Sequence, residues 1–231
     1  MAEEVNRLMQ QIELKSLVLP EFQREFTWNR TQVRKLFESL FKDYPSGSLL
    51  VWETQNPPKI KRDAYDLEKF HSVKVLLDGQ QRLTSLYLHI CGEIPPYYLP
   101  QEIPDEYLDL YFNLENGEFS YKKAHMEGSP LWTRLTDFFN SPPTAFSLIG
   151  ELGIQDPKKI NALGPTIETN IGRLRDIRKY QYPVQTVPGD AHIREAIKVF
   201  DLINSQGTPL TQADIVLAYM TAEWPDIRRE F

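Results

Sequence analysis

Apolar residues recur at helical spacing in several stretches of this chain. Val5, Leu8, Met9 and Ile12 fall three or four positions apart, which is typical of the buried face of an amphipathic helix. The same spacing predicts helices over residues 29–41, 83–90, 157–180 and 190–207 and from residue 211 onward, with a shorter one over 131–140. We expect Asn29 to cap the second helix, and a kink or break at Gly164-Pro165 in the long one.

Short apolar runs predict the strands. These runs cover residues 17–19, 48–52, 73–77 and 182–187. Two further strands, 107–113 and 118–121, flank Asn116-Gly117, a strong signal for a hairpin. Pro183 lacks a backbone donor, so we expect the strand that contains it to lie at the edge of a sheet.

Composition narrows the possible functions. Of the 231 residues, 41% are hydrophobic and 12% aromatic, which is ample for a packed core. The net charge of -6 argues against coating of nucleic acid by bulk electrostatics and favours a nucleotide or small molecule as ligand. A single cysteine, Cys91, excludes an intrachain disulfide and a multi-cysteine zinc site. With no signal-like N-terminus and no membrane-spanning run, we expect a cytoplasmic protein without a membrane partner.

The most promising site is the junction between the strand at 73–77 and the following helix. Asp78-Gly79 predicts a tight turn, and the N–H groups at the start of a helix are free to bind an anion. Arg82 adds a positive charge, and Asp78 is suited to hold a divalent cation or to orient a water molecule. A purely structural alternative stays open, in which Asp78 caps the helix and Gln80 and Gln81 are surface residues.

Two other segments offer polar side chains. Gln23 and Arg24 stand among aromatic residues, and the ring of Trp28 is suited either to stack on a base or to pack in the core. Asn204 and Thr208 flank the expected end of a helix and are placed to reach a ligand, although a glycine C-cap also explains this segment. The basic residues on the 157–180 helix form either a solvated face or a phosphate-binding patch; they are Arg173, Arg175, Arg178 and Lys179.

Taken together, Gln23-Arg24 with Trp28, the string from Asp78 to Leu86 and the segment 204–214 resemble the N-terminal domain of the GmrSD-type restriction endonucleases. That family is similar to the ParB and sulfiredoxin superfamily, whose phosphate-binding turn starts a helix. The resemblance implies a ParB-like α+β domain over residues 1–189, with a small mixed sheet and surrounding helices, and the start of a helical region over 190–231. Gln80 replaces the sulfiredoxin cysteine, which excludes the thiol chemistry.

The resemblance further implies binding and hydrolysis of a nucleoside triphosphate with Mg²⁺, in a defence system that restricts modified or phage DNA. The implied catalytic residues are Asp78, also the metal ligand, with Gln80, Gln81 and Arg82. The implied nucleotide-binding residues are Gln23, Arg24, Trp28, Gly79, Asn204 and Thr208. DNA would be reached through a helical or nuclease region outside these residues, and a homo-oligomer is compatible with this scheme. Two alternatives stay open: a sensor of nucleotide or DNA without turnover, and a nuclease that acts directly at the same turn.

Overall fold

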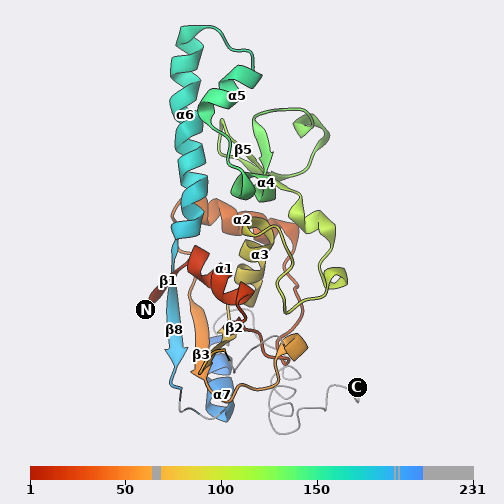
Figure 1. The fold of residues 1–231 in the computed structure, drawn as a ribbon, viewed down its shortest axis with the longest axis vertical. Coiled ribbons are helices and arrows are strands. Elements are labelled where there is room, and N and C mark those ends of the chain that lie inside the picture. Colours follow the sequence, from red (N-terminus) through yellow and green to blue (C-terminus); the bar gives the residue numbers. More distant parts are fainter. Residues whose placement is uncertain (64–68, 190, 192, 205–231) are drawn as a thin grey trace.

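The computed structural model describes residues 1–63, 69–189, 191 and 193–204 (Figure 1). Its helices are α1 (Val5–Glu13), α2 (Arg30–Phe41), α3 (Gln80–Ile90), α4 (Leu135–Asn140), α5 (Ala145–Glu151), α6 (Pro157–Asp176) and α7 (Ile193–Asn204). Its strands are β1 (Ala2–Glu4), β2 (Leu17–Val18), β3 (Leu49–Thr54), β4 (Val73–Asp78), β5 (Leu110–Asn113), β6 (Phe119–Tyr121), β7 (Trp132–Arg134) and β8 (Gln181–Val187).

A five-stranded sheet forms the centre, in the order β1-β8-β3-β4-β2. Parallel and antiparallel pairs alternate along it, so the expected mixed sheet and α+β class are confirmed. Side chains of β3 alternate between two apolar clusters: Leu49 and Val51 join the main core with α1, α2 and α3, whereas Leu50 and Trp52 face the second cluster. Ala196 and Ile197 of α7 belong to that second cluster, so both faces of the sheet are covered.

The expectation that Pro183 marks an edge strand is wrong. β8 lies between β1 and β3, but the two neighbours pair with different parts of it. β1 pairs with residues 181–183, and β3 pairs from Val184 onward. Met1 and Val184 exchange backbone hydrogen bonds, so the next pair, Ala2 with Pro183, is a non-hydrogen-bonded one. The proline therefore occupies a position at which the ladder needs no N–H group.

A second sheet, in the order β6-β5-β7, lies beside α4, α5 and the upper part of α6 (Figure 1). The expected hairpin is present, with Gly117 at a φ of +76° in its turn. The prediction of a helix from residue 131 is wrong at its start, because residues 132–134 pair with β5 and α4 begins only at Leu135. Trp132 and Thr133 favour a strand, and an available partner strand decides the outcome.

The long helix is continuous. α6 runs through Pro165, so the chain does not break there. Proline removes one helical donor, but Asn161, whose carbonyl loses its partner, is exposed, so water can satisfy it. The prediction for α2 is confirmed in detail: the Asn29 side chain accepts from the backbone of Gln32 in a capping box. Residue 190, at which a helix was expected to begin, its expected end at 207 and the helix expected from 211 lie outside the described residues.

Candidate functional site

The predicted strand, turn and helix are present at residues 73–90. β4 ends at Asp78, Gly79 has a φ of +102°, and α3 begins at Gln80. A side chain at position 79 would be strained by this backbone conformation, and its Cβ would lie 2.2 Å from Cδ2 of buried Leu49. The turn therefore requires glycine on two independent grounds.

Arg82 connects this turn to the segment before β3. Its guanidinium donates to the carbonyl oxygens of Ser46 and Ser48, at 2.9 and 2.7 Å, and to Oδ2 of Asp78 at 2.9 Å. The arginine side chain is only 16% exposed. Gly47 makes this approach possible, because a Cβ there would lie 2.0 Å from the arginine Nη1. A direct phosphate contact by Arg82 stays a prediction, and it would compete with these bonds.

Both motif glutamines are buried, with 4% and 7% of their surface exposed. Oε1 of Gln81 accepts from the backbone N–H groups of Thr27 and Trp28, at 2.9 and 3.1 Å, and its amide donates to the carbonyl of Glu25 at 3.0 Å. Nε2 of Gln80 donates to the carbonyl of Arg24 at 2.6 Å. The glutamines therefore fix the loop 24–28 against the start of α3.

Gln23 completes this arrangement from the other side. Its buried Nε2 donates to the carbonyl oxygen of Leu77, the penultimate residue of β4, at 2.6 Å. We call the loop 23–28, together with the hydrogen bonds that Gln23, Gln80 and Gln81 form there, the glutamine clamp. The structural alternative is wrong in both details, because the Asp78 carboxylate pairs with Arg82, Gly79 is the N-cap, and Gln80 and Gln81 are not at the surface.

The start of α3 presents unused backbone donors. The first amide of the helix with an acceptor is that of Leu83, which bonds the carbonyl of Gly79 at 3.0 Å. Within the described residues, the N–H groups of residues 80–82 have no hydrogen-bond partner. Three such donors at the positive end of a helix dipole form an environment suited to an anion.

The main chain of Arg24 lies at the start of α3, where its carbonyl oxygen accepts from Gln80. Its side chain is half-buried, and among the described residues its guanidinium forms no hydrogen bond or ion pair. The glutamine clamp therefore holds the main chain of Arg24 next to the start of α3, and the charge of its side chain is uncommitted among the described residues. The structure thus brings together the first and second of the three segments that the sequence singled out.

Comparison with known proteins identifies the family of this chain. The family model described as the GmrSD restriction endonuclease, N-terminal domain, matches residues 5–221. This chain belongs to that family. A related protein of Methanocaldococcus jannaschii, named as the uncharacterized protein MJ0686, is 37% identical over 83 residues, which are 32% of this chain. The match spans 14% of that relative's length.

The third segment of the GmrSD-type domain contributes little to the described structure. Asn204 is the last residue of α7, and Thr208 lies outside the described residues. The partly buried ring of Trp28 packs against the main core, and the backbone N–H of this residue donates to Oε1 of Gln81. Their predicted nucleotide contacts stay predictions.

Lys61 and Tyr98 join this site without any signal in the motif. The Lys61 ammonium lies 2.7 Å from Oε1 of Glu25, 3.5 Å from the carbonyl oxygen of Arg24 and 5.2 Å from the centre of the Tyr98 ring. Gln80 donates a hydrogen bond to the Tyr98 hydroxyl. Burial raises the pKa of this phenol above its usual range, so Tyr98 is neutral. The polar, proline-bearing sequence around Lys61 predicts only a loop, which is why these contacts were not expected.

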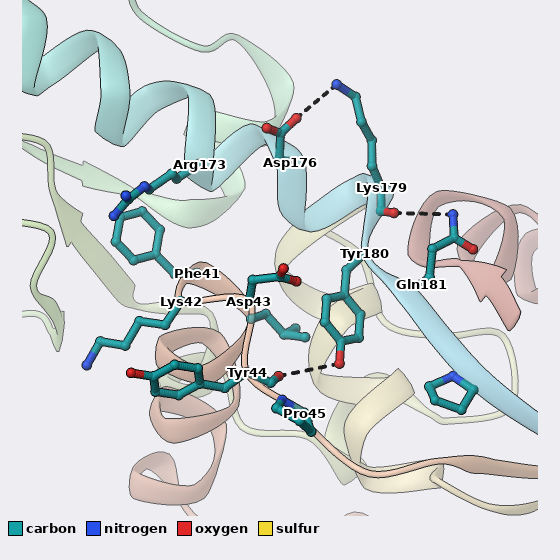
Figure 2. A pocket seen from close by; sticks show the side chains of 12 residues that line it. Phe41, Lys42, Asp43, Tyr44, Pro45, Arg173, Asp176, Lys179, Tyr180 and Gln181 are labelled. Atoms are coloured by element: carbon teal, nitrogen blue, oxygen red, sulfur yellow. Dashed lines mark hydrogen bonds and ion pairs between the residues drawn. The ribbon is translucent and has the colours of Figure 1, made fainter.

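The basic residues at the end of α6 and in the turn that follows it lie elsewhere, near a groove of about 860 Å³ (Figure 2). Arg173 and Lys179 line this groove together with Lys42, Tyr44 and Tyr180. Arg178, which was grouped with them, is instead partly buried and donates to the carbonyl of Phe139 at 3.0 Å. The predicted basic face is thus divided between groove and core.

A divalent cation fits this site only in part. Among the described residues, no group of three or more histidine, cysteine or acidic side chains is placed to hold a metal. Asp78 ends β4 two positions before α3 begins, with a side chain 34% exposed and one oxygen on Arg82. Magnesium is commonly held by one or two carboxylates plus the phosphates of a substrate, so Asp78 suits an ion that arrives with a nucleotide.

In the part of the chain that is described, no helix is both long and apolar enough to cross a membrane.

Proposed function

We propose that this GmrSD-type domain binds a nucleoside triphosphate at the start of α3 and hydrolyses it. In this role the domain regulates a restriction system that acts on modified or phage DNA. The observation that carries the proposal is the set of unpartnered N–H groups of residues 80–82, next to the loop that carries Arg24, whose guanidinium has no partner among the described residues. Family membership supports the restriction-system context. A ParB-like fold is part of the same proposal, supported by the mixed sheet and by the turn that starts a helix.

In this scheme the motif side chains have different roles from those expected. The helix N–H groups and Arg24 contact the phosphates, because they are the donors without protein partners. Gln80, Gln81 and Gln23 are positioning residues, since their amides hold the clamp against the turn. Arg82 positions Asp78 through its ion pair.

Hydrolysis requires little covalent chemistry from the protein. Phosphoryl transfer depends mainly on positioning and on compensation of charge. Mg²⁺ bound with the nucleotide would neutralise phosphate charge, and Asp78 is the residue that would hold it. The free carboxylate oxygen of Asp78 is also the group best placed to orient an attacking water.

The direct test is titration of ATP and GTP, each with Mg²⁺, into the purified chain by calorimetry, together with an assay of phosphate release. We expect Arg24→Ala to weaken nucleotide binding about tenfold or more, since it removes a charge-assisted contact. The matched control is Arg175→Ala, an exposed arginine of α6 away from the turn. Absence of binding for both nucleotides, or equal affinities for R24A and the unaltered chain, would refute the proposal.

A sensor without turnover is the second candidate. The specific observation in its favour is that the described residues offer one carboxylate at the turn and no acidic cluster. Binding with no phosphate release over many hours would support this candidate. Metal-dependent cutting of a plasmid by the chain would instead support direct nuclease chemistry at the turn.

A further inference from the structure

Two lysine–glutamate pairs join the segment before α2 to the segment before β4. Lys59 pairs with Glu21 at 3.2 Å, and Lys61 pairs with Glu25 at 2.7 Å. In the first pair both side chains are similarly exposed, at 18% and 25%. In the second pair the lysine is 8% exposed and the glutamate 53%. The second pair therefore combines a buried cation with an anion at the surface.

This asymmetry has an energetic consequence. A buried ammonium is costly unless an anion compensates it, so Lys61 depends on a negative charge. Glu25, which contributes to this charge, is largely solvated and can return to water at little cost. Tyr98, under the ammonium, cannot replace it, because burial raises the pKa of the phenol and keeps it uncharged.

Lys61 is also directly connected to the start of α3. Its ammonium and Nε2 of Gln80 both contact the carbonyl oxygen of Arg24, at 3.5 and 2.6 Å. Gln80 in turn donates to the hydroxyl of Tyr98, over whose ring the ammonium lies. The buried positive charge is therefore separated from the first residue of α3 by one shared carbonyl group.

We propose that the carboxylate of Glu25 occupies on Lys61 the place that a phosphate group of the bound nucleotide takes. On binding, the phosphate replaces Glu25 as the counter-charge of the ammonium, and the glutamate side chain moves into solvent. The main chain of Glu25 stays in place, since its carbonyl is held by Gln81. This inference rests on the proposed function: it adds Lys61 as a binding residue and Glu25 as a built-in competitor that lowers nucleotide affinity.

The test compares three variants with the unaltered chain, with ATP and GTP plus Mg²⁺ as probes in calorimetry at low and at moderate salt. We expect Glu25→Gln to strengthen binding about tenfold, because the carboxylate that competes with the phosphate for the ammonium is removed. Lys61→Met should weaken binding about tenfold, and the double variant should show no gain from the glutamate change. The matched control is Glu21→Gln, which alters the neighbouring pair and should leave affinity within twofold.

The outcomes separate this inference from the function on which it rests. Nucleotide binding by the unaltered chain with no gain, or a loss, for E25Q overturns the inference and leaves the proposed function standing. Failure of both the unaltered chain and E25Q to bind either nucleotide overturns both. Should K61M not fold, Lys61→Arg replaces it: it keeps the charge, so the gain from E25Q must persist in combination with K61R, and its absence overturns the inference.

Discussion

Two regions of the molecule gather positive charge, and they lie at opposite ends of helices. The groove in Figure 2 is formed where α2 and α6 end, next to Lys42, Arg173 and Lys179. The candidate site lies where α3 begins, next to Arg24 and Lys61. The groove is wide and open, whereas the candidate site is built largely from buried polar side chains.

The difference lies in what the backbone contributes. Helix C-termini present carbonyl groups and the negative end of the dipole, so cations there stabilise the helices themselves. Lys179 is further compensated by Asp176 at 2.9 Å. At the start of α3 the backbone contributes donors instead, and the cations add to them. On these grounds we expect an anion to bind at the start of α3 rather than in the larger groove.

The strongest test of the contrast alters the backbone of the turn. We expect Gly79→Val to destabilise the fold by about 4 kcal/mol and to abolish nucleotide binding, since it combines a positive φ with a clash on Leu49. Urea unfolding and calorimetry measure the two effects. The control is Gly128→Val, at a φ of +72° with open space around it. A G79V cost no larger than that of G128V would show that the Leu49 contact has no role.

The helix that carries the turn has a buried titratable group, His89. Burial lowers the pKa of this imidazole from 6.5 to about 4. The unfolded chain therefore binds a proton at this histidine below pH 6.5, whereas the folded chain binds it only below about pH 4. The free energy of unfolding accordingly falls as the pH falls from 6.5 to 4, by about 3 kcal/mol in total. Urea unfolding at pH 7 and pH 4.5 measures this loss. His89→Leu should reduce it and the exposed-site variant His125→Asn should not; equal slopes in all three chains would contradict the assignment.

The glutamine clamp can be weakened without altering the turn. Gln81→Ala removes three hydrogen bonds to the loop 25–28 and should cost about 2 kcal/mol in stability. Nucleotide affinity should also fall, because the loop that carries Arg24 is then held beside α3 by fewer contacts, those of Gln80 and Gln23. Gln10→Ala, at an exposed position of α1, serves as the reference. If Q81A bound nucleotide with unchanged affinity, the hydrogen bonds of Gln81 would have no role in forming the binding site.

The smallest effect is expected in the groove. Arg173→Ala should destabilise the domain by only about 0.5 kcal/mol, through loss of a favourable charge near the end of α6. Nucleotide affinity should stay within twofold of that of the unaltered chain. A large drop in affinity for R173A, measured by the same calorimetry, would reverse the comparison and move the anion site to the groove.

The sequence predicts the local part of this site well. Apolar runs and Asp78-Gly79 define the strand, turn and helix, because these depend on neighbours in the chain. The partners of the motif side chains could not be predicted in the same way. Arg82 and Gln81 bind main-chain groups about 35 and 55 residues away, which any residue type can supply. Lys61 was missed because its burial arises from tertiary packing on Tyr98, which leaves no local pattern.

The contact between Gly47 and Arg82 has an evolutionary consequence. A side chain at position 47 would occupy the space of the guanidinium, and without the guanidinium the carbonyl groups of Ser46 and Ser48 would lose their donor. A substitution at either position alone is therefore expected to be deleterious. A lineage that loses Arg82 loses the clash at position 47, but the φ of +88° there still favours glycine, so we expect Gly47 to outlast Arg82 among homologues.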